Sequence, residues 1–128
     1  TEQSFWEGIK FAFLGKRISD ISRGVQTYVE SNGFSIVREY VGHGVGASMH
    51  EAPEVPNYVM TRRLGGDPRL LKNMTIAVEP MVNAGTAHIR QLPDGWTVRT
   101  SDGKYAAHYE NTILITDGEP EVLTQCGD

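Results

Sequence analysis

Three side chains with metal-binding chemistry stand out in this 128-residue sequence: one histidine within a glycine-rich segment and two glutamates within apolar runs. His43 lies at the centre of the segment Gly42-His43-Gly44-Val45-Gly46. Glycine neighbours let the backbone approach another group closely and leave the imidazole ring uncrowded. This setting suits a metal ligand, and on spacing alone the alternative is a flexible loop whose histidine only forms a hydrogen bond.

The two glutamates occur where a charge needs a partner. Glu79 follows Ile76-Ala77-Val78 and precedes Pro80, so its charge is costly to bury unless it is paired or bound to a metal. Glu110 lies in a β-prone stretch ending in apolar residues, with His108 expected on the same face. Pairing with Arg or Lys, or a strand end in water, is the alternative. With His43 they form an oxygen-rich donor set suited to Mn, Fe, Co or Zn.

Proton transfer is a second candidate chemistry, carried by His50 and Glu51. Such a pair can move a proton or donate a hydrogen bond to a bound carbonyl group. A solvent-facing loop edge is the alternative interpretation. If Glu79 and Glu110 lie close together without a metal, their repulsion is expected to raise the pKa of one of them.

The elements that must position these residues can be predicted from the spacing of apolar residues and from the positions of glycine, proline and helix-capping residues. Apolar spacing predicts a helix over 5–13, ended by Gly15, and another from Ser19, as N-cap, to Gly33. Prolines and glycines predict a long surface loop over 51–70. Strands are expected over 34–38, 75–79, 88–92, 96–100, 105–116 and 121–124, with a turn at 93–95. The prediction is an α+β fold in a single domain over 1–128.

Composition excludes several other classes of protein. The formal charge of −4 comes without a basic stripe, which argues against nucleic-acid and membrane-surface binding. The first 16 residues mix charged and aromatic side chains, unlike a signal peptide or a membrane span. A single cysteine, Cys126, allows no internal disulfide, so a reducing compartment, the cytoplasm, is expected.

Several motifs occur together in one order and resemble the carboxy-terminal half of the type I methionine aminopeptidases. The motifs are Gly42-His43-Gly44-Val45-Gly46, Met49-His50-Glu51-Ala52-Pro53, Thr75-Ile76-Ala77-Val78-Glu79-Pro80-Met81-Val82-Asn83-Ala84-Gly85, Asp94-Gly95-Trp96-Thr97-Val98 and Tyr109-Glu110-Asn111-Thr112. The part of the third motif from Glu79 to Gly85, together with the fourth motif, favours that family over the related prolidases and aminopeptidases P, which share mainly the Gly-His-Gly, His-Glu and paired glutamate elements.

The resemblance implies half of a pita-bread fold, with two helices packed on a curved antiparallel sheet and a long loop near 51–70. It implies that His43 and Glu79 bind one metal ion and that Glu110 bridges two. Glu79 is then the proton shuttle and His50 the substrate-contacting histidine, while Met49 and Trp96 form walls of the methionine pocket. The implied reaction removes the N-terminal methionine from nascent polypeptides, using two divalent ions (Co, Mn, Fe or Zn) per intact enzyme.

The same resemblance identifies what the chain lacks. The family's centre also needs two aspartates from an amino-terminal half, and no aspartate here fits their motifs. We therefore expect a truncated fragment that holds at most one ion weakly, is inactive alone, has the missing half as its partner, and can self-associate. A non-catalytic half-domain that binds a partner chain, or a prolidase-like relative, is the alternative. His108 replaces a common Gln and Asn111 a common His, so His108 is a possible surrogate ligand.

Overall fold

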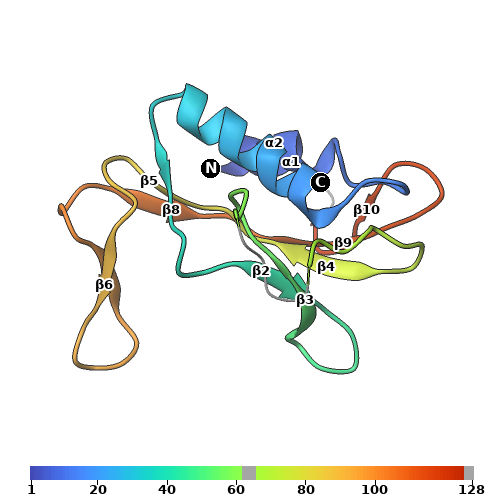
Figure 1. Ribbon diagram of the computed structural model, residues 1–128. Helices are drawn as coiled ribbons and strands as arrows, with labels where there is room; N and C mark the ends of the chain where they lie inside the picture. Colours follow the sequence, from blue (N-terminus) through green and yellow to red (C-terminus); the bar gives the residue numbers. More distant parts are fainter. Residues whose placement is uncertain (62–65, 126–128) are drawn as a thin grey trace.

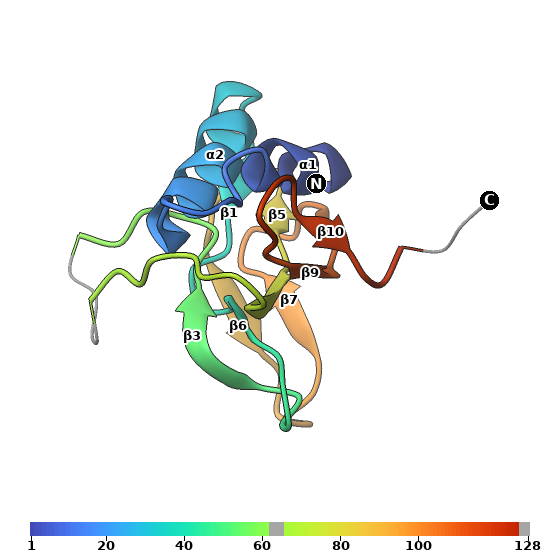
Figure 2. The same ribbon diagram turned by 90° about the vertical axis from the view of Figure 1, so that its right-hand side faces the viewer.

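The computed structural model describes residues 1–61 and 66–125, and consists of two helices and ten short strands. Helices α1 (Glu2–Ile9) and α2 (Ile18–Ser31) pack together over one face of the strands, as Figures 1 and 2 show from two sides. The predicted α+β class with antiparallel strands is confirmed. Cys126 lies outside the described residues.

The strands form three antiparallel sheets rather than one. The five-stranded sheet has the order β10-β9-β4-β2-β3, the three-stranded sheet has the order β1-β5-β8, and β6 pairs with β7. Their bounds are β1 (Ser35–Ile36), β2 (Gly42–Gly44), β3 (Glu51–Val55), β4 (Thr75–Val78), β5 (Met81–Asn83), β6 (Ile89–Gln91), β7 (Val98–Thr100), β8 (Ala106–His108), β9 (Asn111–Leu114) and β10 (Glu121–Val122). The β6–β7 hairpin, predicted from its turn, extends away from the helices (Figure 1).

An apolar core joins the helices to the five-stranded sheet. Phe5 and Ile21 from the helices meet Ile76 and Ile113 from β4 and β9, and all four are fully buried. Because each buried aliphatic or aromatic side chain contributes roughly 1.5–3 kcal/mol, this contact fixes the helix layer on the sheet. A smaller cluster under α2 contains Val25, Val29, Ile36 and Val82.

Both helices begin and end earlier than their sequence patterns predict. The first ends at Ile9, because Phe11 and Ala12 donate backbone hydrogen bonds three residues back rather than four, which tightens the chain into turns before Gly15. The second begins at Ile18 with Arg17 as N-cap, where the Asp20 carboxylate accepts a hydrogen bond from the Arg17 backbone N–H. Ser19, the predicted N-cap, lies inside the first turn and donates to Asp67.

The predicted loop over 51–70 was wrong at its beginning. Residues Glu51–Val55 form β3, and irregular structure begins at Pro56 among the described residues. Pro53 is tolerated because β3 is the edge strand of its sheet, where a missing N–H costs little. The strand that pairs with β2 therefore lies just after His50.

The predicted strand over 105–116 is two strands in different sheets. The chain leaves the three-stranded sheet after His108 and joins the five-stranded sheet at Asn111. The neighbouring segment does the same, since β4 ends at Val78 and β5 begins at Met81, on either side of Glu79 and Pro80. Glu79 and Glu110 are thus both at crossings between the same two sheets.

Candidate metal centre

His43 is held in β2 between two neighbouring strands. It pairs with Ala77 of β4 on one side and with Glu54 of β3 on the other. A Cβ atom added at Gly42 would overlap the backbone carbonyl oxygen of Ala77, and one added at Gly44 would overlap that of Ala52. The glycines are required by close packing of backbone against backbone, and this packing sets the position of the imidazole.

Glu79 and Glu110 are brought together by the paired sheet crossings. Val78 pairs with Asn111 across β4 and β9, and Met81 pairs with His108 across β5 and β8. Between these pairs, the backbone N–H of Tyr109 donates to the carbonyl oxygen of Pro80 over 3.1 Å. The two crossing segments therefore run side by side, and their carboxylates reach the same region as His43.

The predicted ligands lie within reach of a single ion. His43, Glu79 and Glu110 each offer one donor atom, and these atoms all lie within 4.8 Å of one another. The closest contact is 3.1 Å, between His43 Nε2 and Glu79 Oε2. His108 is nearby, with its Nε2 3.7 Å from Glu79 Oε1 and 3.8 Å from Glu110 Oε2.

The hydrogen bonding of His43 leaves a place for a cation. Its Nδ1 lies 3.0 Å from the carbonyl oxygen of Gly44, and because a carbonyl only accepts, this bond requires a hydrogen on Nδ1. The neutral ring then presents the Nε2 lone pair to Glu79 Oε2, a buried oxygen without a hydrogen-bond partner among the described residues. Two electron-rich atoms in contact need a proton or a metal ion between them, so the donor set fits a divalent cation.

Glu79 has the perturbed protonation expected of such a site. Burial, together with the charge of Glu110, raises the pKa of Glu79 to about 7, while His43 acts in the opposite direction. The expectation that one of two close carboxyl groups titrates upward is confirmed. In the metal-free chain Glu79 therefore changes charge near neutral pH.

The stability of the metal-free chain is expected to fall as the pH rises from about 4.5 to about 7. In this window the folded chain binds more protons than the unfolded chain, so the free energy of unfolding declines and then levels off. The displaced pKa sets an upper limit of about 3 kcal/mol on this change in the free energy of unfolding. Because the Glu79 side chain is still 16% exposed and water screens its charge, we expect a change of about half that limit. Urea unfolding with EDTA at about pH 5 and about pH 8 measures it.

The variant Glu79→Gln provides the control, since other groups also titrate in this range. Its stability difference between the two pH values, subtracted from that of the unmodified chain, isolates the contribution of Glu79. Equal pH dependence in the two proteins would contradict the assignment.

The other predicted site residues differ in how close they lie to this cluster. His50 contacts His43, with ring centroids 4.1 Å apart and planes inclined by 45°. Met49 and Trp96 are on the surface, 75% and 89% exposed. Trp96 follows the predicted turn, where Asp94 accepts backbone hydrogen bonds from Trp96 and Thr97. Of the six predicted site residues, the structure therefore brings the two histidines and two glutamates together and leaves the two predicted walls of the methionine pocket exposed.

Two asparagines that position the cluster were missed as site residues. Asn57, fully buried, donates its side-chain N–H to the carbonyl oxygen of Glu79 over 3.1 Å. Asn111 donates to the Tyr109 hydroxyl and accepts from Thr124, which holds the chain beside Glu110 in place. The sequence pattern did not indicate that Asn57 is buried, because Asn57 lies in the segment predicted as a surface loop. Asn111 was noted only as a departure from the family pattern.

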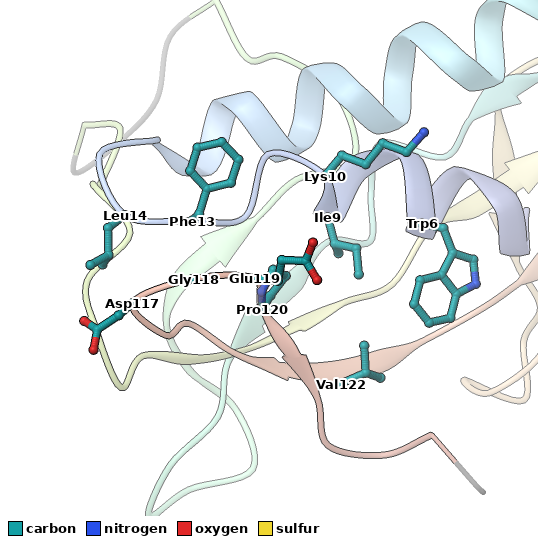
Figure 3. Close-up of a pocket in the computed structure, with 10 residues that line it drawn as sticks. All are labelled: Trp6, Ile9, Lys10, Phe13, Leu14, Asp117, Gly118, Glu119, Pro120 and Val122. Atoms are coloured by element: carbon teal, nitrogen blue, oxygen red, sulfur yellow. The ribbon is translucent and has the colours of Figure 1, made fainter.

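A large cavity lies away from this cluster. A cavity of about 680 Å³ lies between the turn after β9 and α1 with the segment that follows it; Trp6 and Ile9 line it on the side of Val122, and Phe13 lines its other end (Figure 3). No residue of the cluster lines it. A smaller cavity of about 200 Å³ has His108 and Met81 in its wall, next to the carboxylates. The converging donor atoms, rather than cavity size, locate the candidate chemistry.

Among the described residues, neither helix has the length and apolar character needed to cross a lipid bilayer.

Comparisons with known proteins match almost the whole chain. The model of metallopeptidase family M24 matches residues 1–117. The methionine aminopeptidase of Clostridium perfringens is 53% identical over 97% of this chain and 49% of its own length. Methionine aminopeptidase 1 of Bacillus subtilis is 50% identical over 98% of this chain and 49% of its own length. The chain thus spans about half the length of these relatives.

Comparison with solved structures leads to the same family as the comparison of sequences. Methionine aminopeptidase from Thermotoga maritima superposes with a TM-score of 0.90 at 45% identity, covering 98% of this chain and 49% of that one. An X-Pro aminopeptidase from the same organism reaches 0.68 at 18% identity, covering 29% of its length, and shares the fold. The predicted resemblance to the carboxy-terminal half of methionine aminopeptidases, and to half of their pita-bread fold, is confirmed. This chain belongs to metallopeptidase family M24.

Proposed function

We propose that this chain supplies half of the active site of a metal-dependent aminopeptidase that removes N-terminal methionine from nascent polypeptides. The observation that carries the proposal is the convergence of His43, Glu79 and Glu110 in a chain that is at least 50% identical to two methionine aminopeptidases. Residues 1–128 act as one domain, the carboxy-terminal half of the catalytic domain. The expected location is the cytoplasm.

The metal is held on this chain by His43, Glu79 and Glu110, whose oxygen-rich set suits Mn, Fe, Co or Zn. The intact enzyme holds two ions, with the remaining ligands coming from the other half. Three ligands and a partly exposed Glu110 make at most one weak site on this chain.

The chemistry divides among the residues as follows. A divalent ion, when bound, supplies Lewis acidity that lets water attack near neutral pH. Glu79 takes a proton from the attacking water and passes it to the leaving amine, a role that suits a carboxylate at the centre of the cluster. His50, whose ring contacts that of His43 at a tilt of 45°, donates to the carbonyl oxygen as negative charge develops there.

Recognition of methionine is assigned to Met49 and Trp96. A thioether and an indole suit the polarizable sulfur of the substrate. Both side chains are more than two-thirds exposed, as is Tyr105, so this chain presents an apolar surface that another polypeptide can cover. The partner we propose is the amino-terminal half of the fold, and self-association of this chain is the substitute when that half is absent.

The test is a chimera that joins this chain to the part of the Bacillus subtilis relative that it does not match. We expect the chimera, loaded with Co²⁺ or Mn²⁺, to release methionine from Met-Ala-Ser. Its kcat/KM should exceed that of the same chimera carrying Glu79→Gln by roughly a thousandfold, because one group serves as ligand and proton carrier. This chain alone should show no measurable rate.

Two outcomes would contradict the proposal. Preferential cleavage of an Xaa-Pro peptide would assign a prolidase-like activity instead. A folded, metal-loaded chimera that cleaves neither peptide would favour a non-catalytic half-domain that binds a partner chain. Sedimentation of this chain alone at high concentration tests the exposed surface, and a strictly monomeric profile would count against self-association.

A further inference from the structure

We propose that His108 is a fourth metal ligand, which completes a donor set of two histidines and two glutamates on this chain alone. The inference deepens the proposed function and rests on it for the identity of the metal site. It assigns to His108 direct contact with the ion, rather than a role as a neighbouring ion-pair partner.

The position of His108 follows from the sheet crossing. His108 is the last residue of β8 and pairs with Met81, so it lies beside the point where the chain leaves Glu79 and Pro80. Glu110 is two residues further on, after the chain has begun to cross to the five-stranded sheet. The backbone therefore holds His108 next to both glutamates.

The distances from His108 match those between ligands of one ion better than those of a hydrogen bond. Its Nε2 is 3.7 Å from Glu79 Oε1 and 3.8 Å from Glu110 Oε2. Hydrogen bonds between nitrogen and oxygen are about 2.7–3.2 Å long. Donor atoms that share an ion at about 2.0–2.2 Å stand roughly 3.0–3.6 Å apart, so each of these two pairs needs to close by a few tenths of an ångström. The donor atoms that all lie within 4.8 Å of one another are those of His43, Glu79 and Glu110, so the His108 ring must also turn toward His43 to join them.

The two histidines approach Glu79 from opposite oxygens. His43 Nε2 contacts Oε2, whereas His108 Nε2 faces Oε1. Glu79 is therefore placed between two imidazole nitrogens, and Glu110 lies on the His108 side. His108 is 41% exposed, which leaves its ring free to turn onto an ion, while His43 is fixed and only 15% exposed.

Two nitrogens in the donor set change which metal the site prefers. Imidazole suits Zn and Co, whereas carboxylate and water suit Mn. His108 should therefore raise affinity for Zn²⁺ and Co²⁺ much more than for Mn²⁺, and should favour four-coordinate geometry, which structural Zn sites adopt.

The test compares variants of the 128-residue chain by calorimetric titration with Zn²⁺ and Mn²⁺ and by Co²⁺ absorption. His108→Ala should lower Zn²⁺ affinity at least tenfold, change Mn²⁺ affinity less than threefold, and weaken the visible Co²⁺ bands of a four-coordinate site. His88→Ala is the matched control, since His88 is an exposed histidine of the β6–β7 region. It should leave all three readouts unchanged.

A second variant tests whether the side chain at position 108 touches the ion. His108→Cys should give a thiolate-to-Co²⁺ absorption band in the near ultraviolet, which arises only if the side chain at this position touches the ion. The unmodified chain, which retains Cys126, supplies the background. Circular dichroism confirms that each variant is folded.

The inference is overturned if the unmodified chain binds no Zn²⁺, or if His108→Ala leaves Zn²⁺ affinity and the Co²⁺ spectrum unchanged. Failure of the proposed function has a different signature. An inactive chimera together with a tenfold loss of Zn²⁺ affinity in His108→Ala would reject the aminopeptidase activity and keep the ligand assignment.

Discussion

Replacing Glu79 by Gln is expected to lower the metal affinity of this chain at least a hundredfold while the protein remains folded. The Glu79 carboxylate lies 3.1 Å from His43 Nε2 and 3.7 Å from His108 Nε2, so it is next to both proposed histidine ligands. The substitution keeps the size and one carbonyl oxygen of the side chain but removes its negative charge. Calorimetric titration with Zn²⁺, or with Co²⁺ followed by absorption, measures the loss.

The same change should stabilise the metal-free chain at pH values above about 7. An amide carries no charge to bury and can donate a hydrogen bond to His43 Nε2, whereas the ionised carboxylate is desolvated and repelled by Glu110. We expect a gain of about 1–2 kcal/mol in the free energy of unfolding. Loss of binding with gain of stability marks a site selected for chemistry.

Glu121→Gln is the matched control, because Glu121 is an exposed glutamate on β10. It should change neither metal affinity nor stability by a measurable amount. If Glu79→Gln kept the affinity of the unmodified chain, Glu79 would not be a ligand, and the proposed proton shuttle would lose its basis.

The two glutamates were predictable as candidates because a charged residue beside an apolar run requires a partner. What the sequence pattern could not indicate is why they meet. The stretch around Glu110 has continuous β propensity, so it was predicted as one strand, whereas the chain changes sheets at Tyr109 and Glu110. That change is a property of the pairing with Pro80, which is remote in sequence.

The error in the loop over 51–70 has a similar physical origin. Proline lowers β propensity in general, but its cost depends on whether its missing N–H faces a partner or solvent. Pro53 lies in an edge strand, and local composition cannot reveal which strand will be at the edge. Asn57 was overlooked for the same reason, although its buried amide supports the backbone of Glu79.

The helices show the complementary case, in which local signals suffice. Ile21, Val25 and Val29 recur at a spacing of four and are all buried in α2. Such spacing depends only on the geometry of the helix, so it can be recognised in the sequence without knowing which residues pack against the helix. Only the ends moved, because caps depend on neighbours such as Asp67, which lies far along the chain.

Gly42→Ala should have the largest effect on folding of any single methyl group added near the site. The new Cβ would overlap the carbonyl oxygen of Ala77 and stand 3.1 Å from that of Val55, so backbone on both sides of β2 would have to move. Backbone atoms of the strands paired on either side of β2 cannot turn aside as a flexible side chain can. We expect a loss of about 3 kcal/mol in the free energy of unfolding.

The variant should also weaken metal binding at least tenfold in the molecules that remain folded, because His43 is the next residue and its pairing with Ala77 would shift. Gly118→Ala is the matched control, since a Cβ at Gly118 meets no atom within 4 Å, and its stability should stay within about 0.5 kcal/mol of the unmodified chain. Urea unfolding with EDTA measures stability, and Zn²⁺ titration at low temperature measures binding. Equal stability of the two alanine variants would mean that β2 can shift, and that the glycines beside His43 serve something other than close strand packing.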